Sequence, residues 1–192
     1  MEKFTEKRQL RETLKRRRDA LTPEERRRYS RKLCTFLWNQ DWYKENEHIL
    51  VYSAIRSEAD VSDFCEKAWQ DGKKLYFPKV QGETMEFYLT DSMNELVCGS
   101  FSVMEPLENE GRLWSYIGSD RVPILVPGVG FSVKGQRIGY GKGYYDKYLA
   151  IHNHLVPIGI CFETQLLPEL PVDPLDYPMA QIVTEGGCYK VS

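Results

Sequence analysis

A strand–helix–strand pattern in the second quarter of the chain constrains the fold more than any other feature of the sequence. Residues 49–53 form a short apolar run that suits a buried strand, and residues 74–77 are typical of a second one. Between them, Asp60 is expected to cap a helix that runs through Trp69 and stops at Gly72. Two strands joined by a helix are the unit of a parallel sheet, so the pattern predicts an α/β fold.

The rest of the chain extends this pattern. Two helices are expected ahead of the sheet: one over residues 2–21, and one that begins at Thr22, with Glu25 completing a capping box, and ends near Asn39. Further elements are predicted as strands at residues 85–89 (an exposed one), 122–126, 156–160 and 182–184, and as a helix at residues 144–150. No repeat or linker divides the sequence, so we expect one domain over residues 1–192.

Composition excludes several classes of protein. An apolar content of 42% and an aromatic content of 12% exclude a disordered chain. No apolar run approaches the roughly 20 residues that a membrane helix needs, and the N-terminus lacks the apolar stretch of a secretory signal. The five cysteines are odd in number, scattered and free of any CxxC motif, which favours reduced thiols over disulfides or zinc ligands. We therefore expect a soluble cytoplasmic protein.

Three alternating glycines, Gly139, Gly141 and Gly143, precede a predicted helix. Such glycines let backbone N–H groups turn toward one point, and the helix N-terminus adds a partial positive charge. Arg137 and Lys142 add formal charge, so the segment is typical of a phosphate cradle. It matches neither a Walker loop nor a dinucleotide fingerprint, and a flexible glycine-rich surface loop explains the spacing equally well.

Asp146 lies in the first turn of the same helix, where a carboxylate suits the helix dipole. Beside a phosphate this carboxylate would be repelled unless a divalent cation lay between the two groups. Mg²⁺ meets that need, because it binds to one or two carboxylates together with nucleotide phosphates.

Lys7 and Arg11 are four positions apart, so they project from one face of the first helix. A solvated basic face is one interpretation. A nucleic-acid surface is another, because 13 of the 26 basic residues lie within the first 40 positions. Six acidic residues among them and the lack of interleaved aromatic side chains weaken the nucleic-acid interpretation.

Glu58 follows the first predicted strand, where loops beyond the carboxyl ends of strands line the ligand crevice of an open α/β sheet. Its two oxygens suit the hydrogen-bond donors of a planar amino-heterocycle. An exposed loop acid is the alternative interpretation.

Taken together, these segments resemble the 5-formyltetrahydrofolate cyclo-ligase family, also called methenyltetrahydrofolate synthetases. The most specific match comprises residues 127–131, 135–139 and 141–146, with Leu149 after them. Weaker matches in the family's order are Lys7 with Leu10 and Arg11, Glu58, Phe77 with Pro78, Glu105 with Pro106, residues 157–159 with Gln165, and Asp176 leading to Val183 and Thr184. These segments extend over nearly the whole chain.

The resemblance implies a single-domain, Rossmann-like, mostly parallel sheet flanked by helices. It also implies an enzyme that converts 5-formyltetrahydrofolate to 5,10-methenyltetrahydrofolate and splits ATP into ADP and phosphate. A formamide oxygen is a poor leaving group, so the expected route transfers the γ-phosphoryl group to that oxygen and gives an iminium phosphate. This route needs positioning and charge neutralisation, and no nucleophilic side chain.

The resemblance assigns roles to particular residues. ATP is expected to contact Lys7, Arg11, Arg137, Gly139, Tyr140, Gly141, Lys142, Gly143, Tyr144 and Tyr145. The expected folate contacts are Glu58, at the pterin edge, and Tyr144. Asp146 and Asp176 are expected to hold Mg²⁺.

Two positions depart from the family's pattern. Tyr140 stands where the family usually has Arg, and Ser132 stands where it usually has Asp. Of the basic N-terminal residues, only Lys7 and Arg11 are expected at the site, and the other arginines are predicted to form a solvated helix surface. The expected enzyme is a monomer that binds small molecules and neither nucleic acid nor membranes.

Overall fold

A computed structural model of the chain describes residues 2–99, 103–115 and 121–191. Its helices are α1 Glu2–Asp19, α2 Pro23–Trp38, α3 Asp41–Glu45, α4 Ser62–Gln70 and α5 Tyr144–Ile151. The strands are β1 His48–Leu50, β2 Lys74–Gln81, β3 Thr84–Thr90, β4 Val97–Cys98, β5 Met104–Glu105, β6 Val122–Pro127, β7 Gly130–Ser132, β8 Arg137–Ile138, β9 Leu155–Ile160, β10 Leu166–Leu167, β11 Gln181–Val183 and β12 Cys188–Lys190.

The central sheet has seven strands in the order β12-β11-β9-β6-β1-β2-β3. Its five inner strands are parallel, and the edge strands β3 and β12 pair antiparallel with their neighbours. The predicted α/β class with a mostly parallel sheet is therefore confirmed. Strand β12 was not predicted from the sequence; the chain turns at Gly186 and Gly187, and β12 then pairs antiparallel with β11, the expected last strand.

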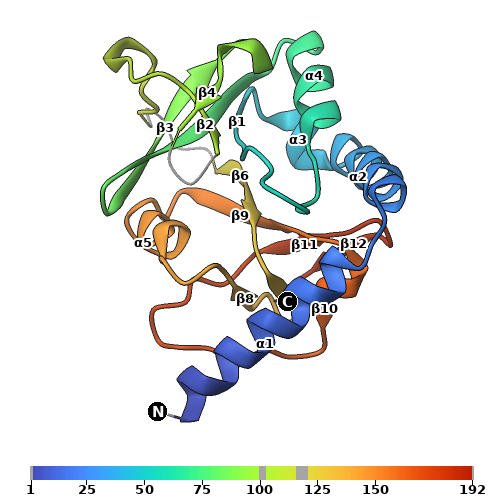
Figure 1. Cartoon of the computed structure of the whole chain (residues 1–192). Coiled ribbons are helices and arrows are strands. Elements are labelled where there is room, and N and C mark those ends of the chain that lie inside the picture. The colour runs from blue at the N-terminus through green and yellow to red at the C-terminus, as the bar shows by residue number, and fades with distance from the viewer. Residues whose placement is uncertain (1, 100–102, 116–120, 192) are drawn as a thin grey trace.

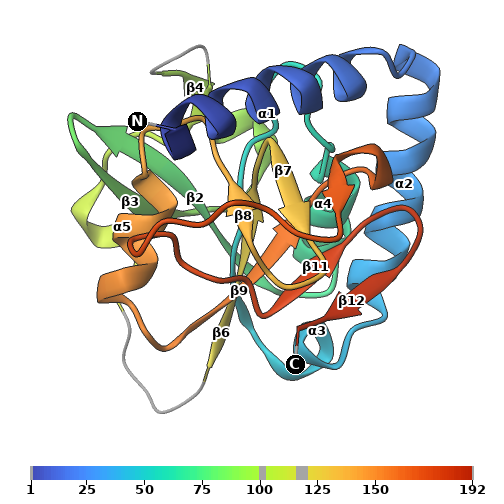
Figure 2. The ribbon, with the colours of Figure 1, turned by 90° about the horizontal axis from the view of Figure 1, so that it is seen from below.

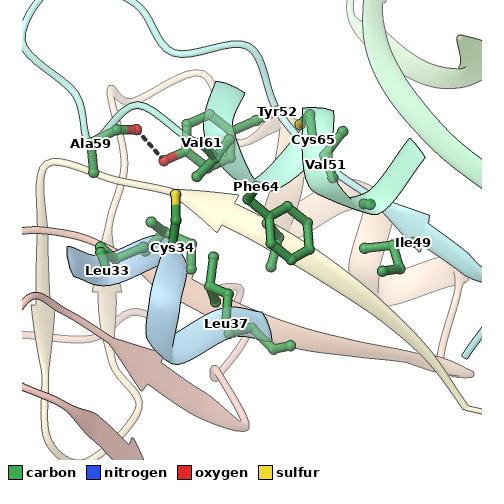
Figure 3. Close-up of a cluster of buried hydrophobic side chains, with 14 of the residues drawn as sticks. Leu33, Cys34, Leu37, Ile49, Val51, Tyr52, Ala59, Val61, Phe64 and Cys65 are labelled. Carbon is green, nitrogen blue, oxygen red and sulfur yellow. Dashed lines mark hydrogen bonds between the residues drawn. The ribbon is translucent and has the colours of Figure 1, made fainter. Parts of the chain in front are cut away.

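Helices cover both faces of this sheet, as Figure 1 shows for α2 and α4 on one side and α5 on the other. Side chains alternate across a strand, so Ile49 packs in one apolar cluster and Leu50 in the other. The first cluster takes Leu37 of α2 and Phe64 of α4 (Figure 3). The second takes Tyr148 and Leu149 of α5. The sheet is thus buried on both faces, which explains its continuous apolar runs.

The first helix lies apart from these layers and crosses the small sheet β10-β7-β8, as Figure 2 shows for β7 and β8. Leu14 is fully buried there against Val129, Ile138 and Leu170. Burial of Leu14 fixes the side of α1 that faces the protein. Arg11 and Lys7 stand three and seven positions before Leu14, and they therefore lie on or beside the same face.

Local details confirm some predictions and correct others. The capping box of Thr22 and Glu25 is present at the start of α2. Asp60 is not the N-cap of α4: that residue is Val61, and Asp60 Oδ1 instead accepts a hydrogen bond from the Ser62 N–H at 2.9 Å. The short side chain of Asp60 makes a local turn one residue ahead of the helix.

The strand expected to be exposed, β3, is largely buried. Its Phe87 ring packs against Tyr148 of α5 at 4.9 Å between centroids, and Met85 and Tyr88 are almost fully covered. Apolar and polar residues do alternate along β3, as the sequence indicated. The strand is nevertheless buried, because α5 and the segment around Trp114 cover it.

The order of the strands places a topological switch point between β1 and β6. From β1 the chain continues to β2 on one side, whereas β6 leads to β9 on the other side. In open α/β sheets, ligands bind outside the carboxyl ends of the two strands at such a point. Within the described residues, no helix combines the length and the apolar character needed to cross a bilayer.

Candidate functional site

A cavity of about 530 Å³ opens at the carboxyl ends of β1 and β6. The loop after β1, the segments after β6 and the face of α1 all line it. Every residue that the sequence analysis assigned to a site lies on its wall: Lys7, Arg11, Glu58, Arg137, Gly139, Tyr140, Gly141, Lys142, Gly143, Tyr144, Tyr145, Asp146 and Asp176. The fold thus brings together residues from both ends of the chain.

Lys7 reaches from α1 to the C-terminal loop. Its Nζ lies 2.5 Å from Asp173 Oδ2 and 2.5 Å from Asp176 Oδ2, and its side chain is buried. Burial lowers the pKa of Lys7, but hydrogen bonds and charge from Asp173 and Asp176 raise it by more, so the pKa lies above its ordinary value. The ammonium group is therefore held in its charged form inside the cavity wall.

Arg11 holds the glycine-rich loop in place. Its Nε donates a hydrogen bond to the Gly139 carbonyl at 2.9 Å. Gly141 and Gly143 have φ angles of 98° and 71°, and a side chain at either position would be strained. Gly143 is also the residue that precedes the first turn of α5. The loop therefore takes its shape from its glycines and its position from α1.

Arg137 and Asp146 form an ion pair on the cavity wall, with Nη2 2.8 Å from Oδ2. Arg137 Nη1 also donates to the Pro127 carbonyl at 3.3 Å. Among the described residues, Arg137 Nε has no hydrogen-bond partner, although it is buried. The other oxygen of Asp146, Oδ1, accepts a hydrogen bond from the Tyr177 N–H at 3.2 Å. Arg137 is thus a buried cation with one donor left unsatisfied by the protein, as suits a site for an anion.

Three carboxylates, from Asp146, Asp173 and Asp176, lie along the same wall. Each of them contacts a cationic side chain of the protein. Within the parts of the chain that the structure describes, no group of three or more acidic, histidine or cysteine side chains forms a cage for a metal ion. The carboxylates of Asp146 and Asp176 are hard oxygen ligands of the kind that Mg²⁺ prefers. Two carboxylates do not complete the coordination of Mg²⁺, so these residues suit a Mg²⁺ ion that is also bound to phosphates.

Glu58 is buried beside the glycine-rich loop, with 8% of its surface exposed. Its Oε2 accepts the Ile55 N–H at 3.0 Å, and its Oε1 accepts the Tyr140 hydroxyl at 2.5 Å. Burial raises the pKa of Glu58 above its ordinary value, although Tyr140, the Ile55 N–H and the charge of Arg18 act in the opposite direction. Glu58 is therefore not the exposed loop acid that the sequence also allowed.

The cavity has an apolar part as well. Tyr52, Ile55, Pro78, Val80 and Met85 line it. Most of them come from the loop after β1 and from the end of β2. This part adjoins Glu58, so a ring bound there would have apolar walls and a carboxylate within reach of its edge.

The two remaining tyrosines of the loop differ in their surroundings. The Tyr144 hydroxyl donates to the Gly82 carbonyl at 3.0 Å, which links α5 to the turn between β2 and β3. The Tyr145 ring lies 5.7 Å from Arg137 Cζ, and burial raises the pKa of its hydroxyl. Ser132, in contrast, does not line the cavity: it is fully buried and donates to Gln136 Oε1 at 2.7 Å.

Two residues of the site region were missed. Asp173 is not among the expected site residues, yet it contacts Lys7. Arg18 was grouped with the solvated arginines, and that prediction was wrong, because only 2% of its surface is exposed and it donates to Ser57 and Tyr140. A signal was present for Arg18: it lies seven positions after Arg11, on the same face of α1.

Known proteins resemble this chain over most of its length. A model of the 5-formyltetrahydrofolate cyclo-ligase family matches residues 3–185. The mouse 5-formyltetrahydrofolate cyclo-ligase is 29% identical over 94% of both chains, and that of Escherichia coli K12 is 28% identical over 92% of this chain and 99% of its own.

Two solved structures share the fold. The NMR structure of the Aquifex aeolicus 5,10-methenyltetrahydrofolate synthetase is 33% identical, with a TM-score of 0.81 over 96% of this chain and 92% of its own. A synthetase from Mycoplasma pneumoniae has a TM-score of 0.70 at 24% identity, over 93% of this chain and 98% of its own.

Proposed function

This chain belongs to the 5-formyltetrahydrofolate cyclo-ligase family, and from that premise we propose that it closes 5-formyltetrahydrofolate to 5,10-methenyltetrahydrofolate at the expense of ATP. The observation that carries the proposal is one cavity that joins a charged part to an apolar part. The charged part holds Lys7, Arg11, Arg137 and Lys142, and the apolar part adjoins Glu58. A phosphate chain suits the first and a pterin ring the second.

The chemistry explains why ATP would be needed. The N5-formyl oxygen cannot leave as oxide, so the γ-phosphoryl group is transferred to it and ADP departs. The resulting iminium phosphate has an electrophilic carbon, which the neighbouring N10 amine attacks. Phosphate then leaves with the former formyl oxygen, and the N10 proton is lost to water. Each step balances without a covalent bond to the protein.

In this proposal the protein positions both substrates and neutralises negative charge. Lys7, Arg11 and Lys142 lie where they can contact the phosphates, and the unsatisfied Nε of Arg137 points to the same task. The left-handed glycines Gly141 and Gly143 let the loop approach the nucleotide without side-chain obstruction. Gly139, Tyr144 and Tyr145 belong to the same nucleotide-binding wall.

Asp146 and Asp176 would hold Mg²⁺ together with the phosphates of ATP. The ion supplies positive charge that offsets the phosphate oxygens during transfer. In its absence Arg137 pairs with Asp146 and Lys7 pairs with Asp176, and these contacts hold the two carboxylates in place.

Glu58 would accept hydrogen bonds from the amino edge of the pterin. A carboxylate has about four acceptor positions, and hydrogen bonds from Ile55 and Tyr140 take two of those of Glu58. Tyr144, whose hydroxyl donates to the Gly82 carbonyl, would contact the folate as well as the nucleotide. We propose that the enzyme acts as a monomer in the cytoplasm, and its five free cysteines fit that reducing compartment.

An isotope experiment tests the proposed route. 5-Formyltetrahydrofolate labelled with oxygen-18 in its formyl group is incubated with the protein and Mg-ATP, and the released phosphate is analysed by mass spectrometry. The proposal expects one labelled oxygen in each phosphate. Unlabelled phosphate accompanying methenyl product would contradict phosphoryl transfer to the formyl oxygen.

A substrate panel tests the assignment of substrate. Tetrahydrofolate, 5-methyltetrahydrofolate and 5-formyltetrahydrofolate are compared for their ability to trigger ATP hydrolysis. Only the formyl compound should do so. Hydrolysis that another phosphate acceptor triggers, without the formyl compound, would favour a different phosphate-dependent enzyme on the same fold.

A further inference from the structure

A chain of hydrogen bonds runs from α1 through the glycine-rich loop to the loop after β1. Arg18 Nη1 donates to the Tyr140 hydroxyl oxygen at 3.0 Å, and that hydroxyl donates to Glu58 Oε1 at 2.5 Å. The direct distance from Arg18 Nη1 to Glu58 Oε1 is 4.0 Å. The Tyr140 hydroxyl therefore lies between the guanidinium of Arg18 and the buried carboxylate of Glu58. Its two hydrogen bonds couple the positive charge of Arg18 to the carboxylate.

The two ends of this chain are firmly anchored. Arg18 Nε donates to Ser57 Oγ at 2.9 Å, and Ser57 in turn donates to Asp19. Glu58 Oε2 is fixed by the Ile55 N–H. Tyr140 as a whole remains 36% exposed, although its hydroxyl donates to the buried Glu58. The hydroxyl contacts therefore help to fix the position of this side chain, together with Lys15 and Arg18, which lie near its ring.

We propose that Tyr140 is a positioning residue that, together with Arg18, orients the Glu58 carboxylate for the ring-bearing substrate. This inference rests on the proposed function, and it reassigns Tyr140 from the nucleotide to the folate side of the cavity. It also accounts for the departure from the family's usual Arg at this position. Arg18 supplies the positive charge expected at this position. The Tyr140 hydroxyl links that charge to Glu58 through its two hydrogen bonds.

The expected consequence is a change in the titration of Glu58. Charged and titratable groups facing this carboxylate are Arg18 on α1, Arg56 on its own loop, Tyr52 after β1, Tyr140 on the glycine-rich loop and Tyr145 on α5. Of these, Tyr140 donates a hydrogen bond to the charged form, which favours ionisation. Removing the hydroxyl makes the carboxylate harder to ionise, so protonation of Glu58 extends to higher pH.

The variant Tyr140→Phe tests this directly. Loss of one hydrogen bond to a charged group weakens binding of 5-formyltetrahydrofolate by about tenfold or more. The KM for ATP should change less than twofold. The acid limb of kcat/KM for the folate, which reports the free enzyme, should move to higher pH. Binding of the folate is measured separately by titration calorimetry, so the result does not depend on turnover.

Tyr43→Phe is the matched control. Tyr43 also donates its hydroxyl to a carboxylate, Asp71 Oδ2 at 2.6 Å, but it lies on α3 and does not line the cavity. Its loss should leave the folate affinity and the pH profile unchanged. A second control is the double variant with Glu58→Gln. In that background Tyr140→Phe should have no further effect, because there is no carboxylate left to orient.

The outcomes separate this inference from the proposed function. Unchanged folate binding in Tyr140→Phe, or a rise confined to the KM for ATP, would overturn the role given to Tyr140. A further loss of binding in the Glu58→Gln background would overturn it too. If the wild-type protein binds the folate without forming product, the proposed function fails, and a weaker Tyr140→Phe complex still supports the inference. If the wild-type protein does not bind the folate, both fail.

Discussion

Lys7 and Asp176 are 169 positions apart in the sequence, yet Lys7 Nζ lies 2.5 Å from Asp176 Oδ2. The same ammonium group contacts Asp173, so the first helix is tied to the C-terminal loop at the cavity wall. From the sequence, Lys7 was expected to contact phosphate and Asp176 to bind Mg²⁺. In the structure the two neutralise one another, and we expect them to exchange this contact for the charges of a bound Mg–nucleotide complex.

Lys7→Met should weaken both nucleotide binding and stability. Lost hydrogen bonds to two carboxylates cost about 1.5–3 kcal/mol in free energy of unfolding, because the ammonium is buried. The KM for ATP should rise at least about tenfold for a contact of similar strength to the phosphates. Thermal unfolding and steady-state kinetics measure the two effects. Lys74→Met, which breaks an exposed pair with Glu47, is the control and should change neither by much.

The stabilising effect of Lys7 should depend on pH in one direction. Burial lowers its pKa, but Asp173 and Asp176 raise it by more, to above the ordinary value of 10.5. A group whose pKa is raised on folding stabilises the protein fully below the unfolded pKa and loses that effect as pH rises through the folded one. The difference in melting temperature between wild type and Lys7→Met should therefore stay constant near neutral pH and shrink above about 10.5. A difference that grows with alkaline pH would contradict the ion pair.

Gly143→Ala and Gly72→Ala form a matched pair. Their φ angles are 71° and 77°, and an added Cβ would meet nothing within 4 Å at either position. Both should lose about 1–2 kcal/mol of stability from backbone strain. Only Gly143→Ala should also raise the KM for ATP, because Gly143 shapes the glycine-rich loop at the start of α5. The same KM for ATP in both variants would contradict a role of the glycine-rich loop in nucleotide binding.

Leu14→Ala tests how far docking of α1 controls the site. Leu14 is fully buried on the inward face of α1, and truncation of such a leucine lowers the free energy of unfolding by about 2–5 kcal/mol. Since Lys7 and Arg11 are on the same helix, the KM for ATP should rise as well. Leu33→Ala on α2 removes an equally buried side chain away from the cavity. It should lower stability by a similar amount and leave the KM for ATP unchanged.

Asp146→Asn should lose most activity while the protein remains folded. The asparagine keeps an oxygen that can accept from Arg137 Nη2, so the local structure is preserved, but it is a poor ligand for Mg²⁺. The concentration of Mg²⁺ at half-maximal activity should rise. Asp91→Asn, at a surface pair with Arg112, serves as the control. A fully active Asp146→Asn enzyme with an unchanged Mg²⁺ dependence would exclude Asp146 as a metal ligand.

Local sequence signals predicted much of the fold. The capping box of Thr22 and Glu25, the stop at Gly72 and the apolar run of β6 depend on neighbouring residues, and the structure has all three. The edge strand β12 was missed because nothing in its short, mixed sequence shows that it pairs back on β11. The burial of β3 depends on α5, about 60 positions later in the chain, so alternation alone could not predict it.

The gathering of the site residues followed from strand order, since the carboxyl ends of β1 and β6 meet at the switch point. The contacts among those residues could not be predicted in this way. Tyr140 was assigned by its place in the motif, whereas its hydroxyl contacts Glu58, 82 positions earlier. Arg18 follows other arginines in the sequence, and its immediate neighbours did not distinguish it from them. Such pairings depend on where α1 docks, which no local pattern specifies.

The most direct test of the account is formation of the methenyl product with and without ATP. Purified protein is mixed with 5-formyltetrahydrofolate and Mg²⁺, and the near-ultraviolet absorbance of 5,10-methenyltetrahydrofolate is followed while ADP is measured in parallel. We predict no absorbance change until ATP is added, and then one ADP for each methenyl product. Product formation at the same rate without ATP, or no product while a known cyclo-ligase is active under the same conditions, would contradict the account.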